Sequence, residues 1–138
     1  MNFSELVHLY FERSNSLQGY WTVYVVIVGG LLAFSSLRKA PDPVTTILVT
    51  VLFSFFAYKN LGAIEDVSLQ RFAVLQAVNR VEPGETAQTG ELRKLFGPTL
   101  NPPAIDGVKK FHIASDLLTV AALWAMERRR RKGTLTPV

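Results

Sequence analysis

The chain has 138 residues, of which 49% are apolar and 19% charged, and it contains no cysteine. That length fits one compact unit, and the missing thiols exclude disulfide frameworks, thiolate zinc sites and cysteine nucleophiles. The net charge is +4, but removing the five cations at 128–132 leaves −1. The remainder is therefore not a basic surface, and we expect no nucleic-acid binding.

Residues 2–13 have the spacing of a short amphipathic helix. Asn2 and Glu5 form a capping-box pattern, and apolar side chains recur on one broad face. Because the segment is too short to cross a bilayer, we expect an interfacial helix, interrupted by the polar run at 14–16. Acidic residues precede the first apolar block, so the pattern does not fit a cleavable signal peptide.

The first uncharged apolar block predicts a membrane span at residues 17–37. Its start carries aromatic side chains of the kind that gather at a membrane interface. Gly29, Gly30 and Ala33 are small enough to let another helix approach closely. We expect this face to pack against the second or third helix of the same chain, with homodimerisation as the alternative.

A turn at 38–43 contains two prolines, which end one helix and begin the next. The following apolar block predicts a second span at 44–64. Residues 65–107 form a predicted outer segment, whose first part, 65–81, switches to amphipathic spacing and can continue directly from the second span. A short helical candidate at 91–96 precedes a proline-rich extended connection.

A third span is predicted at 108–127, with Asp106 as its N-cap. A basic tail at 128–138 follows the span. Its cations serve as a topology signal, and they are also suited to binding anionic lipid head groups. These cations are Arg128, Arg129, Arg130, Arg131 and Lys132.

The distribution of cations predicts how the chain is threaded. Cations flank the first turn and follow the third span, whereas the segment at 62–108 carries more acids than bases. Because cytoplasmic loops are enriched in lysine and arginine, we expect the N-terminus outside and the C-terminus in the cytoplasm. A bacterial inner membrane is the expected location.

One polar group is predicted inside the apolar region. His112 and Asp116 are four residues apart and share a helix face, and Lys59 is the expected counter-charge of the acid. Three interpretations remain open: a buried polar pair that fixes helix packing, a proton or solute path, and a metal site completed by Glu65 or Asp66.

These features together predict a single all-α integral membrane domain over residues 1–138. It has three transmembrane helices, an N-terminal interfacial helix and an extracytoplasmic amphipathic helix. No catalytic motif or cofactor site is evident. We therefore expect a non-catalytic membrane subunit, an accessory, assembly or scaffold component that associates with other membrane subunits or with itself. The alternative is a homo-oligomeric channel or proton-coupled transporter that uses Asp116, Lys59 and His112.

Overall fold

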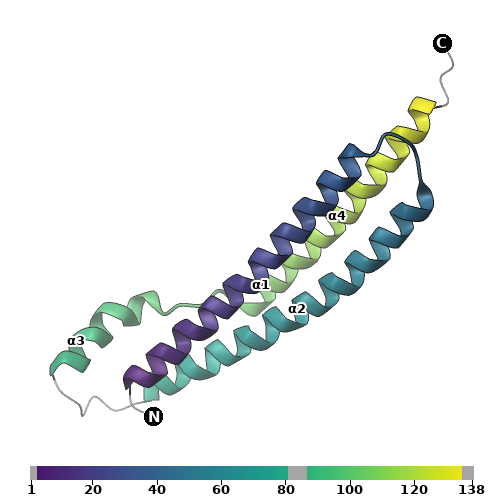
Figure 1. Cartoon of the computed structure of the whole chain (residues 1–138). Coiled ribbons are helices and arrows are strands. Elements are labelled where there is room, and N and C mark those ends of the chain that lie inside the picture. The colour runs from purple at the N-terminus through teal and green to yellow at the C-terminus, as the bar shows by residue number, and fades with distance from the viewer. Residues whose placement is uncertain (1–2, 81–86, 135–138) are drawn as a thin grey trace.

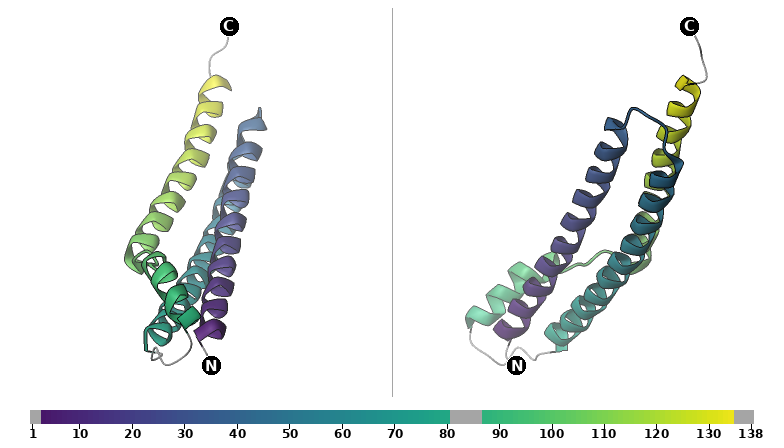
Figure 2. Two further views of the ribbon diagram at one scale, coloured as in Figure 1. Left: turned by 90° about the vertical axis from the view of Figure 1, so that its left-hand side faces the viewer. Right: turned by 45° about the vertical axis from the view of Figure 1, so that its right-hand side comes forward.

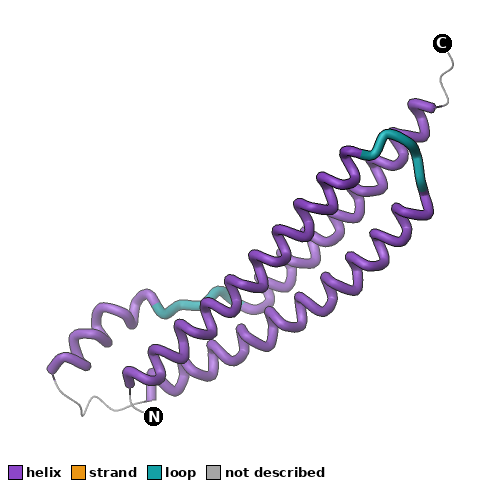
Figure 3. Tube along the Cα trace, viewed as in Figure 1, coloured by secondary structure: helices purple, strands orange, loops and turns teal. Residues whose placement is uncertain are grey.

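The computed structural model describes residues 3–80 and 87–134, and 92% of these are helical. The described part contains no strand, so the all-α prediction is confirmed. Figures 1 and 3 show the order of the elements along the chain. They are α1 (Phe3–Leu37), α2 (Pro43–Arg80), α3 (Ala87–Phe96), the 3₁₀ turn η1 (Gly97–Thr99) and α4 (Ile105–Thr134).

Three long helices form an elongated bundle. α1 and α2 run antiparallel along their whole length, and α4 packs on both of them in the half that contains the α1–α2 loop (Figures 1 and 2). α3 lies at the opposite end of the bundle, beside the start of α1. The half of the bundle that contains α4 therefore has three long helices, and the other half has two.

The turn between α1 and α2 forms where the prolines predict it. Pro43 is the first residue of α2, a position where its missing N–H is not needed. Asp42 caps the helix, because its Oδ1 accepts a hydrogen bond from the Thr45 backbone N–H at 3.0 Å. Hydrogen bonds from the Thr45 hydroxyl and backbone, with the nearby Arg38, hold the pKa of Asp42 below its usual value.

The predicted interruption after residue 13 is wrong, because α1 continues without a break from Phe3 to Leu37. The hydroxyls of Ser14 and Ser16 donate to the carbonyls of Tyr10 and Glu12, four residues earlier in the same helix. Buried Tyr10 and Leu17 flank the polar run, so tertiary packing holds this stretch in the helix. The proposed cap Asn2 lies outside the described residues.

The other boundaries differ less from the predictions. α2 continues from the second apolar block to Arg80, as the spacing indicated. The short outer helix begins at Ala87 rather than at residue 91. Asp106 is not an N-cap, because α4 already starts at Ile105 and the acid lies in its first turn. α4 also extends to Thr134, so the basic run is helical.

The core consists of three apolar clusters that follow one another along the bundle. The first joins the start of α1 to the end of α2, the second lies at the level where α4 begins, and the third lies among the three helices. Their most buried members are Val78, then Ile64, and then Phe53. Each cluster is small, as expected for a bundle two or three helices wide.

α1 and α2 are long and apolar enough to cross a membrane, judged by length and composition. α4 does not reach the same hydropathy, since His112 and Asp116 interrupt its apolar run. Large apolar side chains remain exposed along the half of the bundle that contains α4. Only four of those exposed in the described part of the chain lie elsewhere, namely Phe11, Leu69, Leu95 and Phe96.

The continuity of α1 can be tested at Asn15, an exposed position in the middle of the polar run. Asn15→Pro should lower the free energy of unfolding by about 3 kcal/mol, because proline removes one helical hydrogen bond and clashes with the preceding turn. Asn15→Ala is the control and should be neutral or slightly stabilising. Thermal unfolding in mild detergent, followed by circular dichroism, measures both, and equal midpoints would show that the helix is interrupted there.

Candidate functional site

A chain of polar side chains connects all three long helices in the interior of the bundle. The Tyr24 hydroxyl of α1 donates to Asp116 Oδ1 of α4 at 2.8 Å. His112 Nδ1 lies 2.9 Å from Asp116 Oδ2, and the Asn60 side-chain nitrogen of α2 lies 3.2 Å from His112 Nε2. We call these four residues the inner network.

Hydrogen-bond chemistry assigns a direction to the inner network. An ionised carboxylate only accepts, so Asp116 accepts one hydrogen bond from the Tyr24 hydroxyl and one from His112 Nδ1. In the tautomer that carries its proton on Nδ1, His112 donates to Asp116, and its Nε2 accepts from the Asn60 amide. Within the inner network, each donor therefore points along the series of hydrogen bonds toward Asp116, its single acid.

Aromatic rings enclose the histidine. His112 is fully buried, and the ring centroids of Tyr24 and Trp21 lie 4.4 and 5.6 Å from its own. Trp21 also contacts the ring of Phe111 on α4. This enclosure fixes the ring of His112, so the inner network can position helices, and access to the imidazole would require these rings to move.

The predicted pairing of Lys59 with Asp116 is wrong. Lys59 is exposed and borders a cavity of about 450 Å³ together with Glu65 and Asp66. Neighbouring residues of an α-helix point about 100° apart, so only one of residues 59 and 60 can face the bundle. Asn60 takes that place.

Asn60 lies on the face of α2 that packs into the bundle. The residues of α2 that are buried in the bundle recur at intervals of three and four, which is the spacing of one helix face. Asn60 falls in this series, whereas Lys59 does not. The series is Phe53, Ala57, Asn60, Ile64 and Val67.

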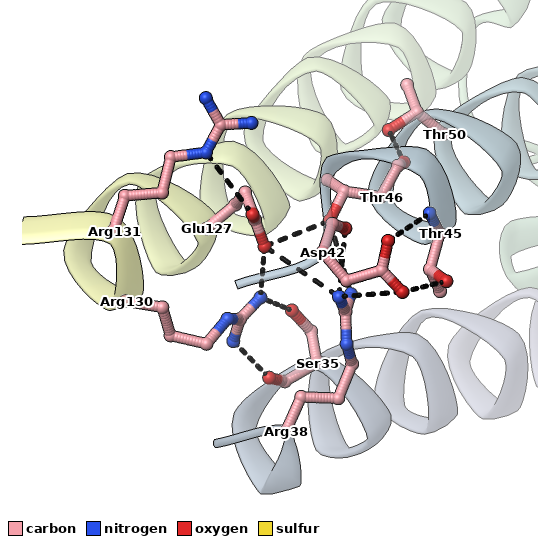
Figure 4. Close-up of polar contacts among 9 residues, drawn as sticks. All are labelled: Ser35, Arg38, Asp42, Thr45, Thr46, Thr50, Glu127, Arg130 and Arg131. Atoms are coloured by element: carbon pink, nitrogen blue, oxygen red, sulfur yellow. Dashed lines mark hydrogen bonds and ion pairs between the residues drawn. The ribbon is translucent and has the colours of Figure 1, made fainter. Parts of the chain in front are cut away.

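A second polar group surrounds Glu127 at the end of the bundle near the α1–α2 loop (Figure 4). The Glu127 side chain is 1% exposed and receives hydrogen bonds from Arg130 at 3.1 Å and Arg131 at 3.4 Å. Thr46 of α2 donates to it at 3.2 Å, and a nitrogen of Arg38 lies 3.8 Å away. We call these residues the Glu127 network.

The same network reaches the end of α1. A guanidinium nitrogen of Arg130 donates to the backbone carbonyl of Ser35 at 2.6 Å. Hydrogen bonds to Glu127 and to that carbonyl therefore hold Arg130 between α1 and α4. Arg130 of the basic run therefore takes part in helix packing, while Arg131 pairs with Glu127 within α4. Their spacing of three and four residues from Glu127 could have indicated this pairing.

An apolar layer separates the two networks. Phe53 and Leu123 are each 2% exposed, and Val120 packs in the same region. The buried Thr119 hydroxyl lies in this part of α4 but donates to the Ser115 carbonyl of its own helix. Among the described residues, no hydrogen bond connects the inner network to the Glu127 network.

The small residues of α1 do not pack where we expected. Gly29, Gly30 and Ala33 are all exposed. A Cβ atom built on either glycine would meet no atom within 4 Å. The prediction that this face packs on the second or third helix is therefore wrong, because α1 presents its Tyr24 side to the bundle.

Neither a metal site in the described residues nor a similar protein points to a function. Within residues 3–80 and 87–134, no three histidine, aspartate or glutamate side chains lie close enough to hold a metal ion. Glu65, one proposed additional ligand, instead pairs with Lys109 at 2.8 Å. No protein family, curated protein or solved structure matches this chain.

Glu127 and Glu65 both form ion pairs with residues outside their own helix, but they differ in burial and should contribute differently to the free energy of unfolding. Glu127→Ala should lower the free energy of unfolding by about 3–5 kcal/mol, because it leaves the largely buried Arg130 guanidinium without its carboxylate partner. Glu65→Ala is the control: its pair with Lys109 is about one-third exposed and should contribute less than about 1 kcal/mol. Thermal unfolding in mild detergent measures both, and equal losses would mean that Glu127 does not join the helices.

Proposed function

We propose that this chain is an integral membrane protein with three spanning helices, which acts as a non-catalytic subunit of a larger assembly. The distribution of polar and apolar groups supports insertion. Exposed apolar side chains cover the outside of the three-helix half, while its interior holds hydrogen-bonded polar groups. Polar residues inside membrane bundles face the interior and are partnered in this way.

The distance between charged levels also supports insertion. The Lys109–Glu65 pair marks one level and Glu127 the other, 18 residues farther along α4. At ~1.5 Å per residue, that spacing is about 27 Å, close to the ~30 Å thickness of a bilayer hydrocarbon core. Asp116 then lies about 10 Å inside the boundary, where its bonds to Tyr24 and His112 compensate for burial. The cation bias supports an orientation with the Glu127 end on the cytoplasmic side, and we propose a bacterial inner membrane as the location.

The observation that carries the subunit role is the open face at Gly29, Gly30 and Ala33. Three helices are packed together, yet the residues best suited to close helix approach contact none of them. A transmembrane helix of a partner or a second copy would fit this face. The apolar layer at Phe53 and Leu123 further supports a structural role, since it divides the interior of a single chain.

The inner network favours one alternative, a proton-coupled transporter or channel formed by several copies. A partnered acid and histidine at membrane depth are typical of proton pathways. Lys59, an original candidate for this role, has no part in the network. In that alternative, His112 and Asp116 would exchange protons with water at the outer end of the bundle.

The subunit role predicts a specific effect of Gly29→Ile. The open space around Gly29 should let the chain itself fold and insert normally, while the new side chain blocks a partner helix. We expect recovery of the assembled complex, by co-purification in mild detergent, to fall several-fold. Gly19→Ile is the control, since it adds the same side chain at another open position of α1. Unchanged recovery for Gly29→Ile would mean that this face contacts lipid only.

Asp116→Asn separates the structural role from proton transport. An amide keeps the shape and the hydrogen bond from Tyr24, so a structural role predicts normal assembly and retained cellular function. Asp66→Asn, at an exposed acid, is the control. The measurement combines co-purification with complementation of a deletion strain. Normal assembly with lost function in Asp116→Asn alone would support the transport alternative.

A further inference from the structure

A cavity opens beside the Glu127 network, where the end of α1, the following turn and the end of α4 meet. Its volume is about 620 Å³, within the range of small-molecule sites. Four cationic side chains line it: Arg38, Lys39, Arg129 and Arg130. Met126 supplies an apolar part of the wall. The two pairs of cations are about ninety residues apart in the chain, so only the fold brings them together.

Two of these cations are already held in position. The side chains of Arg38 and Arg130 are 16% and 10% exposed, and both contact the Glu127 carboxylate. Arg38 also donates to the Asp42 carbonyl at 2.9 Å, and Arg130 donates to Ser35. A ligand would therefore meet a preformed positive wall, with little conformational entropy left to lose.

The other two cations supply unbalanced charge. Lys39 and Arg129 are exposed, and no ion pair joins either to an acid in the described part of the chain. At this end of the bundle, seven cations in segments 35–46 and 126–134 face two acids. Glu127 is surrounded by arginines, and Asp42 caps α2. The cavity therefore suits an anion with several acceptor oxygens.

We propose that this cavity binds the phosphate of an anionic phospholipid from the cytoplasmic leaflet. The proposal rests on the membrane placement given above, which puts the cavity at the edge of the hydrocarbon core. Exposed Phe34 and Leu37 lie on α1 next to the cationic residues, and the Arg38 guanidinium lies 5.9 Å from the Phe34 ring centroid. A phospholipid whose phosphate binds Lys39 and Arg129 would place its acyl chains beside these apolar side chains.

Adjacent arginines allow a matched test. Arg129 lines the cavity, whereas its neighbour Arg128 has the same charge and is exposed but does not line it. The purified full-length chain in detergent is titrated with phosphatidylglycerol or phosphatidylcholine, and bound lipid is counted by native mass spectrometry. We expect preference for phosphatidylglycerol, about five-fold weaker binding in Arg129→Ala, corresponding to about 1 kcal/mol for one cation, and little change in Arg128→Ala.

Equal weakening of phosphatidylglycerol binding by Arg128→Ala and Arg129→Ala would contradict the proposed site, because it would indicate diffuse attraction of the lipid to the basic run. Equal binding of the two lipids would also overturn it. Displacement of phosphatidylglycerol by inorganic phosphate at millimolar concentration would show that the site takes a soluble anion instead.

Membrane insertion is checked separately: Leu95→Cys should react with an impermeant thiol reagent in intact cells, and Gly133→Cys only after permeabilisation. Failure of that labelling contradicts the proposed membrane topology, whereas correct labelling without lipid preference contradicts only the lipid site.

Discussion

The buried carboxylate of Glu127 is the contact on which the meeting of the three long helices depends. Arg38 of the α1–α2 turn lies 3.8 Å from it, and it accepts hydrogen bonds from Thr46 of α2 and Arg130 of its own helix. A buried acid is costly unless donors surround it, and here the partners come from α2, from α4 and from the turn that follows α1. The acid therefore fixes the rotation and axial position of α4, although charge pairing of this kind contributes less to net stability than apolar packing of the same volume.

The inner network applies the same constraint about 16 Å away along α4. Tyr24, Asn60 and His112 each come from a different long helix, and each makes a hydrogen bond that the others cannot replace. Between the two networks, apolar side chains such as Phe53 and Leu123 fill the interior. The bundle is thus held at two polar levels with an apolar layer between them, an arrangement that restricts sliding of the helices more than apolar contacts alone would.

The residues that face outward are determined by those that make the interior contacts. α1 turns Tyr24 inward, so Gly29 and Ala33 face outward and remain open to another helix. α4 turns Glu127 and Arg130 inward, so Arg129 is left at the rim of the cationic cavity. The surfaces that we propose for a partner helix and for a lipid phosphate are both consequences of the rotation that the interior contacts impose.

The sequence by itself determined the long apolar helices and the turn between the first two, because apolar spacing and proline positions act over a few residues. It also identified the His112–Asp116 pair, since a helix brings residues four apart together wherever it packs. Tertiary structure decided which residues face inward. On α2 it is Asn60 rather than Lys59, and on α1 it is the side with Tyr24 rather than the side with Gly29. It also kept α1 helical through residues 14–16 and joined Glu127 to Arg38. These outcomes depend on how each helix is rotated against the others, a choice set by contacts between residues far apart in the chain.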